Sequence, residues 1–157
     1  MASEISIDQS QLATPPILYA EITLCFDCNL PVDSLNDIIG LQAIRAMRRQ
    51  DTRINPFTKH HNPGYWSYRT KRFSSFDCEE LFALVNDLLV THTAEFEKVI
   101  QRYTPCELFV RIYVAVQQEG EFPAIRIDPV LLSTLSSLNA YIDIIVENDY
   151  ADSSCEQ

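Results

Sequence analysis

Two stretches of the chain, residues 17–26 and 106–117, alternate between apolar and other side chains, and this alternation constrains the fold more than any other feature. Successive side chains of a β-strand point to opposite faces, so a period of two predicts a strand with one buried face. We therefore expect a sheet with one apolar side. The residues on that side are Leu18, Ala20, Ile22, Leu24 and Phe26 in the first stretch, and Leu108, Val110, Ile112, Val114 and Val116 in the second.

A long helical pattern separates these two strands. From Asp77 to Tyr103, apolar residues recur every three to four positions, and Pro105 ends the pattern. Asp77 followed by Glu80 has the spacing of a capping box. We expect a kink or a split at residues 91–93, where Thr-His-Thr interrupts the pattern.

Shorter elements are predicted on either side. A short helix capped by Asp33 or Ser34 should stop at Gly40, and a second should begin at Asp128-Pro129, with Leu131, Leu132, Leu135 and Leu138 as its buried stripe. Residues 42–49, 65–73 and 140–146 are expected to be strands, the last with Ala140, Ile142, Ile144 and Val146 inward. Residues 50–64 are expected to be a long polar loop, and Glu119-Gly120-Glu121 a hairpin turn into a strand over residues 124–127.

These elements predict an α+β fold. We expect an antiparallel or mixed sheet of about five or six strands, with two or three helices packed on one face. Residues 30–47 and 128–144 share a proline turn, a short helix and a strand, which suggests a duplicated strand-helix-strand unit. The expected organisation is a flexible N-terminal arm (residues 1–16), one α+β domain (17–147) and an acidic C-terminal tail (148–157).

Composition and charge indicate where in the cell the protein is expected and what kind of partner it would bind. The chain has no long apolar run and no signal-like N-terminus, so we expect a cytoplasmic protein without a membrane segment. Five cysteines, an odd number, argue against a disulfide framework. The net charge of −10 disfavours nucleic acid and anionic membrane and favours a basic partner.

The positive charge is concentrated in one window. Eight of the twelve Lys and Arg residues lie between Arg45 and Arg72, where only Asp51 opposes them. A long loop rich in positive charge would be a recognition surface or a mobile segment.

Two sets of residues are candidates for partner binding, because Tyr, Trp, Phe and Arg are enriched at interface hot spots. One set surrounds the aromatic run in the basic window. The other lies on the side of the sheet opposite the apolar one, where Tyr19, Glu21, Thr23 and Asp143 should also point. The alternative interpretation of this side is that residues 50–64 or the N-terminal arm cover it, or that it is a solvated face. The candidates are Arg48, Tyr65, Trp66, Arg69 and Lys71 in the first set, and Phe109, Arg111, Tyr113, Arg126 and Tyr141 in the second. For Trp66, packing in the core is the alternative interpretation.

Catalytic and metal signals are weak. Cys25 and Cys28 have C-x-x-C spacing, but no second pair of ligands accompanies them, and a structural role is expected. His60 and His61 are adjacent in the basic loop, and no spacing assigns them an orienting carboxylate or a nucleophile. With three glycines in the chain, a phosphate-binding loop is excluded. We expect no catalytic residue, metal or cofactor.

The run Gly64-Tyr65-Trp66-Ser67 resembles the signature of the bacterial family described as domain of unknown function 4279. The order of elements over residues 17–147 is also similar to that of the family. Residues 41–51 depart from the family pattern after Gly40. The resemblance implies a small α+β domain in a bacterial cytoplasm and brings no established activity.

Three functions remain open at this level. The first is a non-catalytic protein-binding domain, such as a bacterial immunity or antitoxin-like protein that binds a basic toxin. The second is a single-stranded nucleic-acid binder that uses aromatic and arginine side chains on an open sheet. The third is an enzyme that uses His60 or His61 of the loop.

Overall fold

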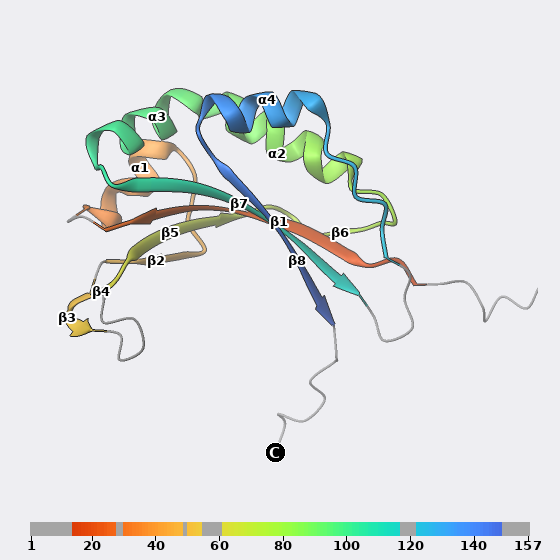
Figure 1. Ribbon diagram of the computed structural model, residues 1–157, viewed down its shortest axis with the longest axis horizontal. Coiled ribbons are helices and arrows are strands. Elements are labelled where there is room, and N and C mark those ends of the chain that lie inside the picture. Colours follow the sequence, from red (N-terminus) through yellow and green to blue (C-terminus); the bar gives the residue numbers. More distant parts are fainter. Residues whose placement is uncertain (1–13, 28–29, 49, 55–60, 117–121, 149–157) are drawn as a thin grey trace, which may run out of the picture.

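The computed structural model describes residues 14–27, 30–48, 50–54, 61–116 and 122–148, and for residues 50–54 and 61–62 it describes the backbone alone. One six-stranded mixed sheet dominates these residues, and four α-helices pack on it (Figure 1). The predicted α+β class is confirmed. Four helices are present where two or three were expected, because the long helix is split and the short helix before Gly40 packs with the others.

Strand β1 (Ile17–Phe26) lies at the centre of the sheet, antiparallel to β5 (Gly64–Arg69) on one side and to β7 (Cys106–Val116) on the other. Beyond β5 lies β2 (Arg45–Met47), again antiparallel. Beyond β7 lies β8 (Tyr141–Asn148), which runs parallel to β7. The two-residue strand β6 (Phe73–Ser74) pairs with the start of β1.

Helices α1 (Leu35–Ile39), α2 (Glu79–Thr91), α3 (Thr93–Arg102) and α4 (Pro129–Ser137) all lie on the same side of this sheet, whereas no described helix lies on the other side (Figure 1). A short 3₁₀ turn, η2 (Val32–Ser34), precedes α1. None of the helices formed by the described residues combines the length and the apolar character that a bilayer crossing requires.

The four strands lie in the order β2-β5-β1-β7 across the sheet. Along the chain, these strands and the helices between them follow as strand, helix, strand, strand, helix, strand. This is the split β-α-β arrangement of ferredoxin-like domains. Helix α4 and β8 extend it by one further unit, and the parallel pairing of β8 with β7 needs the crossover that α4 supplies. The extension makes β8 one edge of the sheet and leaves β2 at the opposite edge.

Local interactions explain where the helices begin and end. The Asp128 carboxylate accepts a hydrogen bond from the Val130 amide at 2.6 Å, so Asp128 caps α4 as predicted. Asp77 accepts one from the Glu79 amide at 2.9 Å, and α2 therefore begins just after it. Gly40 ends α1 with φ +78°, a left-handed conformation that glycine adopts without strain.

The predicted split of the long helix is confirmed. His92 lies between α2 and α3 with φ −110°, outside the helical range. The Thr93 hydroxyl donates to the Leu89 carbonyl at 2.7 Å, and this bond holds the start of α3 against the end of α2. The split lets the two helices follow the twisted sheet.

The core lies between the helices and the apolar side of the sheet. Trp66 is fully buried there, with its ring edge-to-face against Phe96 at 6.5 Å between centroids. Its indole nitrogen donates to the Asn36 side-chain oxygen at 2.9 Å, which ties β5 to α1. The alternation in β1 and β7 predicted this layer correctly, since all ten apolar residues on that side are buried.

Three local predictions were wrong. Residues 50–64 are not one loop: β3 (Gln50–Ile54) and β4 (His61–Asn62) form a separate antiparallel pair. No strand forms over residues 124–127, where Ala124 makes a single bridge to Asp77 before the chain enters α4. Of the residues predicted to be inward near the C-terminus, three are substantially exposed, because β8 is an edge strand and one side of α4 faces outward: Leu132, Ile144 and Val146.

Candidate functional site

The helix-free face of the sheet carries the side chains that alternate with the core residues. The strand registers place these residues beside one another: Arg45 of β2, Tyr65, Ser67 and Arg69 of β5, Tyr19, Glu21 and Thr23 of β1, Glu107, Phe109, Arg111 and Tyr113 of β7, and Tyr141, Asp143, Ile145 and Glu147 of β8. We call this set the open face. In Figure 1 it is the lower side of the sheet, opposite the four helices.

Glu21 occupies the middle of the open face and is 1% exposed. Arg45 donates to both of its carboxylate oxygens, at 3.0 and 2.8 Å. Arg69 donates from Nε at 3.0 Å and from Nη2 at 2.6 Å, and the Tyr113 hydroxyl donates at 3.4 Å. A buried carboxylate is tolerated only when it is paired and hydrogen-bonded in this way. The hydrogen bond to Glu21 raises the pKa of the Arg69 guanidinium, which therefore stays charged.

Aromatic rings flank this cluster in two stacked pairs. Tyr19 and Tyr113 are parallel within 5°, with ring centroids 4.7 Å apart. Arg69 and Arg72 lie over the Tyr19 ring at 5.0 and 5.3 Å. Stacking and cation–π contacts each add order to such a surface. Burial raises the pKa of both tyrosines above the usual value, with a further contribution from Glu147 for Tyr19 and from Glu21 for Tyr113.

The second pair lies towards β8. Phe109 stacks on Tyr141 with centroids 5.1 Å apart, and Arg111 lies over Phe109 at 5.5 Å. Arg111 also approaches the Asp143 carboxylate at 3.7 Å. Tyr141 is half exposed, so this pair presents an apolar ring to solvent at the rim of the open face.

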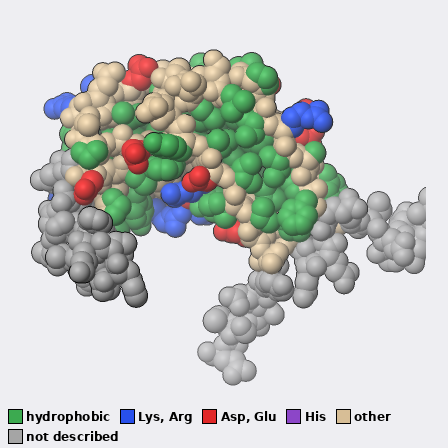
Figure 2. All heavy atoms as spheres, viewed as in Figure 1, with side chains coloured by type: hydrophobic (Ala, Val, Ile, Leu, Met, Phe, Trp, Pro, Cys, Tyr) green, Lys and Arg blue, Asp and Glu red, His purple; other side chains and the backbone are tan. Residues whose placement is uncertain are grey.

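Charge is divided across the open face. Arginines gather over β2, β5 and the start of β1, where Arg45 and Arg69 bind the carboxylate of Glu21 and Arg72 lies over the Tyr19 ring. Carboxylates gather over β7 and β8, where Glu107, Asp143 and Glu147 accompany Arg111. Figure 2 shows side chains of both signs grouped beneath the sheet, on the side away from the helices. A surface with a positive half and a negative half can fix the orientation of a partner.

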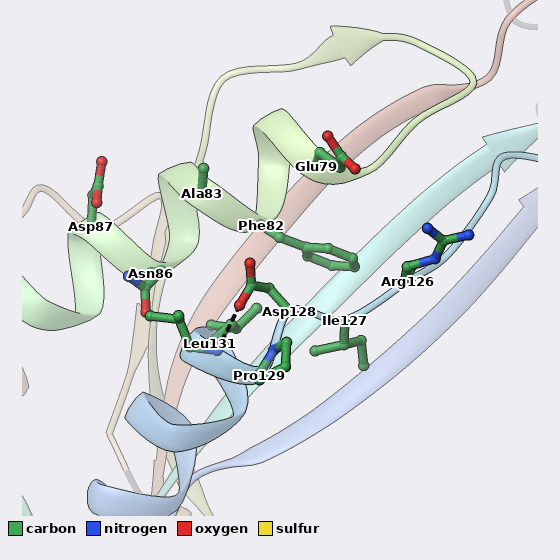
Figure 3. Close-up of a pocket in the computed structure, with 11 residues that line it drawn as sticks. Glu79, Phe82, Ala83, Asn86, Asp87, Arg126, Ile127, Asp128, Pro129 and Leu131 are labelled. Carbon is green, nitrogen blue, oxygen red and sulfur yellow. Dashed lines mark hydrogen bonds between the residues drawn. The ribbon is translucent and has the colours of Figure 1, made fainter.

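The structure brings together six of the ten predicted partner-binding residues on the open face: Tyr65, Arg69, Phe109, Arg111, Tyr113 and Tyr141. Including Trp66 in a binding patch was wrong, because this side chain is fully buried on the helix side. Arg126 was placed on the open face by a strand that does not form. It lies instead on the segment that leads into α4 (Figure 3).

Arg48 and Lys71 are exposed but lie outside the open face. Arg48 pairs with Asp33 of η2. Lys71 lies 3.7 Å from Glu80 of α2 and over the Phe73 ring at 4.7 Å. Sequence reasoning did not propose Arg45 or Arg72 as binding residues. Arg45 is placed on the open face by its position opposite Ser67, and that position depends on the register between β2 and β5.

A groove between α2 and α4 has a volume of about 530 Å³. Phe82, Ile127 and Leu131 line it, with Glu79 and Arg126 nearby (Figure 3). Two of its polar groups have structural partners: Asp128 caps α4, and Asn86 accepts a hydrogen bond from the Thr134 hydroxyl at 2.8 Å. The other charged groups that line the groove are Glu79, Asp87 and Arg126, and they lie among apolar side chains, so the groove offers a mainly apolar surface.

The described residues contain no cluster of three or more His, Cys, Asp or Glu side chains that could hold a metal ion. Burial raises the pKa of the thiols of Cys25 and Cys78, so both are protonated at neutral pH and poor nucleophiles. Cys28 and His60 lie outside the described residues. His61 is described by its backbone in β4, so the enzyme hypothesis that rested on the two histidines stays a prediction.

Comparison with known proteins assigns the chain to a family and leaves its activity open. Over residues 17–149 the chain matches the model of the family described as Domain of unknown function (DUF4279). Neither the curated proteins nor the solved structures contain a significant match. The match begins with β1 and extends just beyond β8, so it includes all the strands of the open face. The chain therefore belongs to the DUF4279 family.

Proposed function

We propose that this protein is a non-catalytic binding domain that takes a protein partner on the open face of its sheet. The observation that carries the proposal is the composition and order of that face. Arginine, tyrosine and phenylalanine side chains dominate it, and stacking and the Glu21 cluster hold them in place. Side chains that are ordered before binding lose little entropy when a partner docks.

The charge of the chain indicates the kind of partner. With a net charge of −10, the domain attracts basic proteins over long distances. At contact, the arginine half of the open face would meet carboxylates of the partner, and the Asp143 and Glu147 half would meet its basic groups. A bacterial immunity or antitoxin-like protein, which neutralises a basic toxin in the cytoplasm, is the form of this function that we favour.

Affinity capture from the source organism tests the proposal. The bait is the full chain, compared with Arg111→Ala on the open face and Arg102→Ala on α3, which removes the same charge from the exposed helix layer. The partner should be retained by the unmodified chain and by Arg102→Ala. Capture by Arg111→Ala should fall at least about tenfold. Equal capture by all three baits, or no captured protein at low salt, would reject the open face as the binding surface.

Binding of single-stranded nucleic acid is a second candidate, favoured by the same combination of rings and arginines on an open sheet. Two features weigh against it. Tyr19 is already stacked on Tyr113 and covered by arginines, so its ring is not free to stack on a base. The centre of the face holds the Glu21 carboxylate. Fluorescence anisotropy with labelled DNA and RNA oligonucleotides at low and high salt decides the matter, since a nucleic-acid binder must show salt-dependent affinity.

A further inference from the structure

Strand β8 lies at one edge of the sheet, and it lacks two kinds of residue with which natural proteins usually protect an edge strand. It is eight residues long and contains no Lys and no Pro, and its one described strand partner is β7. Edge strands of this length commonly carry such residues or a bulge, because an open row of backbone donors and acceptors pairs readily with another strand. The edge of β8 is therefore a candidate site for pairing with another strand.

The apolar side chains of β8 are also incompletely covered. On the helix side, Ile144 is 42% exposed and Val146 48% exposed. Val130 and Leu132 of α4, just before β8 in the chain, are exposed as well. Figure 2 shows hydrophobic side chains covering much of the side of the molecule that β8 crosses. Exposed apolar residues beside an open strand edge are typical of an interaction surface.

We propose that β8 pairs antiparallel with β8 of a second copy of this chain, so that two sheets join into one. The sequence of the strand is suited to pairing with itself. About a two-fold axis perpendicular to the sheet, residues that face each other must lie on the same side of the sheet. If Ile144 faces Ile144, then Ile142 faces Val146, Asp143 faces Ile145, and Tyr141 faces Glu147. This register builds a continuous apolar row on the helix side.

Charge selects this register over its neighbours. A pairing centred on Asp143 would place that carboxylate directly opposite its own copy. A pairing centred on Ile145 would place Asp143 opposite Glu147 twice. Like charges directly opposite each other destabilise a strand pair. With Ile144 at the centre, acidic groups meet only diagonally, and Arg111 lies 3.7 Å from Asp143 to offset part of that repulsion.

An extended segment of another protein could use the same edge, but the self-complementary order of β8 favours a second copy. The inference does not depend on the open face binding a partner, because it concerns the edge of the sheet. If both hold, the dimer joins two open faces side by side, with the Phe109 and Tyr141 pairs nearest the junction.

Sedimentation velocity of the full chain tests the proposal. We expect a species of twice the 18.0 kDa chain mass. Each copy carries a net charge of −10, so association should be several-fold tighter at about 500 mM salt than at about 50 mM, as screening weakens the mutual repulsion. A monomer at both salt concentrations, over the micromolar range, would overturn the proposal.

A pair of matched variants locates the contact. Ile144→Lys places two ammonium groups opposite each other at the two-fold axis and should weaken the dimer at least about tenfold. Ile44→Lys is the control: Ile44 has nearly the same exposure, 45%, but lies beside β2 at the opposite edge of the sheet. A dimer that resists Ile144→Lys, or that dissociates with Ile44→Lys, contradicts pairing through β8.

Hydrogen exchange on the unmodified chain provides a test that does not depend on how a variant folds. The backbone amides of β8 that point away from β7 should exchange more slowly as protein concentration rises into the dimer range. Amides of β1, at the centre of the sheet, should show no such change. Concentration-independent exchange in β8, in a sample that sedimentation shows to be dimeric, would place the interface elsewhere and refute the inference.

Discussion

The two faces of the sheet are built from the same strands but exclude water in different ways. On the helix side, aliphatic side chains of β1 and β7 pack with Trp66 against α2 and α3. On the open face, Glu21 is equally buried, but beneath arginines and a tyrosine rather than beneath a helix. Apolar packing is tolerant of small changes in shape, whereas a buried ion cluster depends on each of its partners. The difference suggests that one face provides stability and the other provides recognition.

The largest effect should come from the helix side. Trp66→Ala removes a fully buried ring and leaves a cavity between β5 and α3, so the free energy of unfolding should fall by about 3–5 kcal/mol. Its neighbour Tyr65 points to the open face and is half-buried, and Tyr65→Ala should cost about 1 kcal/mol. Urea denaturation of the two variants measures both values. Equal losses would mean that the two faces contribute equally to stability.

An intermediate effect is expected at the centre of the open face. Glu21→Ala leaves Arg45 and Arg69 without their shared carboxylate, and the free energy of unfolding should fall by about 2–3 kcal/mol. The loss is smaller than for a fully enclosed pair, because both arginines reach solvent. Glu107→Ala, on the same face but exposed, is the control and should change stability by less than about 0.5 kcal/mol. No loss with Glu21→Ala would show that the cluster is dispensable for folding.

The smallest effect is the pH dependence of the tyrosine pair. The pKa of Tyr19 and that of Tyr113 lie above the usual 10.0 in the folded protein, mainly because burial disfavours the charged form. The folded state thus holds these protons more tightly than the unfolded chain. Their contribution is complete below pH 10 and is lost as pH rises through the folded-state pKa values.

Tyr19→Phe tests this contribution. The variant should lose less stability than the unmodified chain as pH rises above 10, by about 1 kcal/mol or less. Denaturation series at neutral and alkaline pH measure the difference. Parallel curves for the two proteins would mean that Tyr19 ionises as freely in the folded state as in the unfolded one.

The sequence predicted the parts of the fold that depend on local pattern. Period-two alternation located β1 and β7, and Asp128, Gly40 and Thr91-His92-Thr93 marked helix boundaries correctly. Sequence pattern failed to predict the parts of the fold that depend on pairing between strands far apart in the chain. The turn predicted at Glu119-Gly120-Glu121 lies outside the described residues, but the strand predicted after it, over residues 124–127, does not form; the chain crosses over through α4 instead, and β8 pairs parallel with β7. The burial of Ile144 and Val146 was overestimated for the same reason. The alternation of apolar residues shows which face of the sheet a side chain lies on, but not whether its strand is at the edge of the sheet.

The candidate site could be predicted in part. The period-two alternation along β7 and β8 assigned four residues to the open face, because both strands were predicted correctly: Phe109, Arg111, Tyr113 and Tyr141. Trp66 and Tyr65 are adjacent, so one of them had to be inward, and composition alone did not show which. The convergence of Arg45 and Arg69 on Glu21 spans three strands and depends on two registers, which no local pattern encodes.

An alanine scan along β7 tests the central claim most directly. We predict that the free energy of unfolding falls by about 2–4 kcal/mol for Leu108, Val110, Ile112 and Val114, which face the helices. It should fall by less than about 1.5 kcal/mol for Phe109, Arg111 and Tyr113, which lie between them on the open face. Losses that do not alternate along the strand would contradict the division of the sheet into a stabilising face and a recognition face.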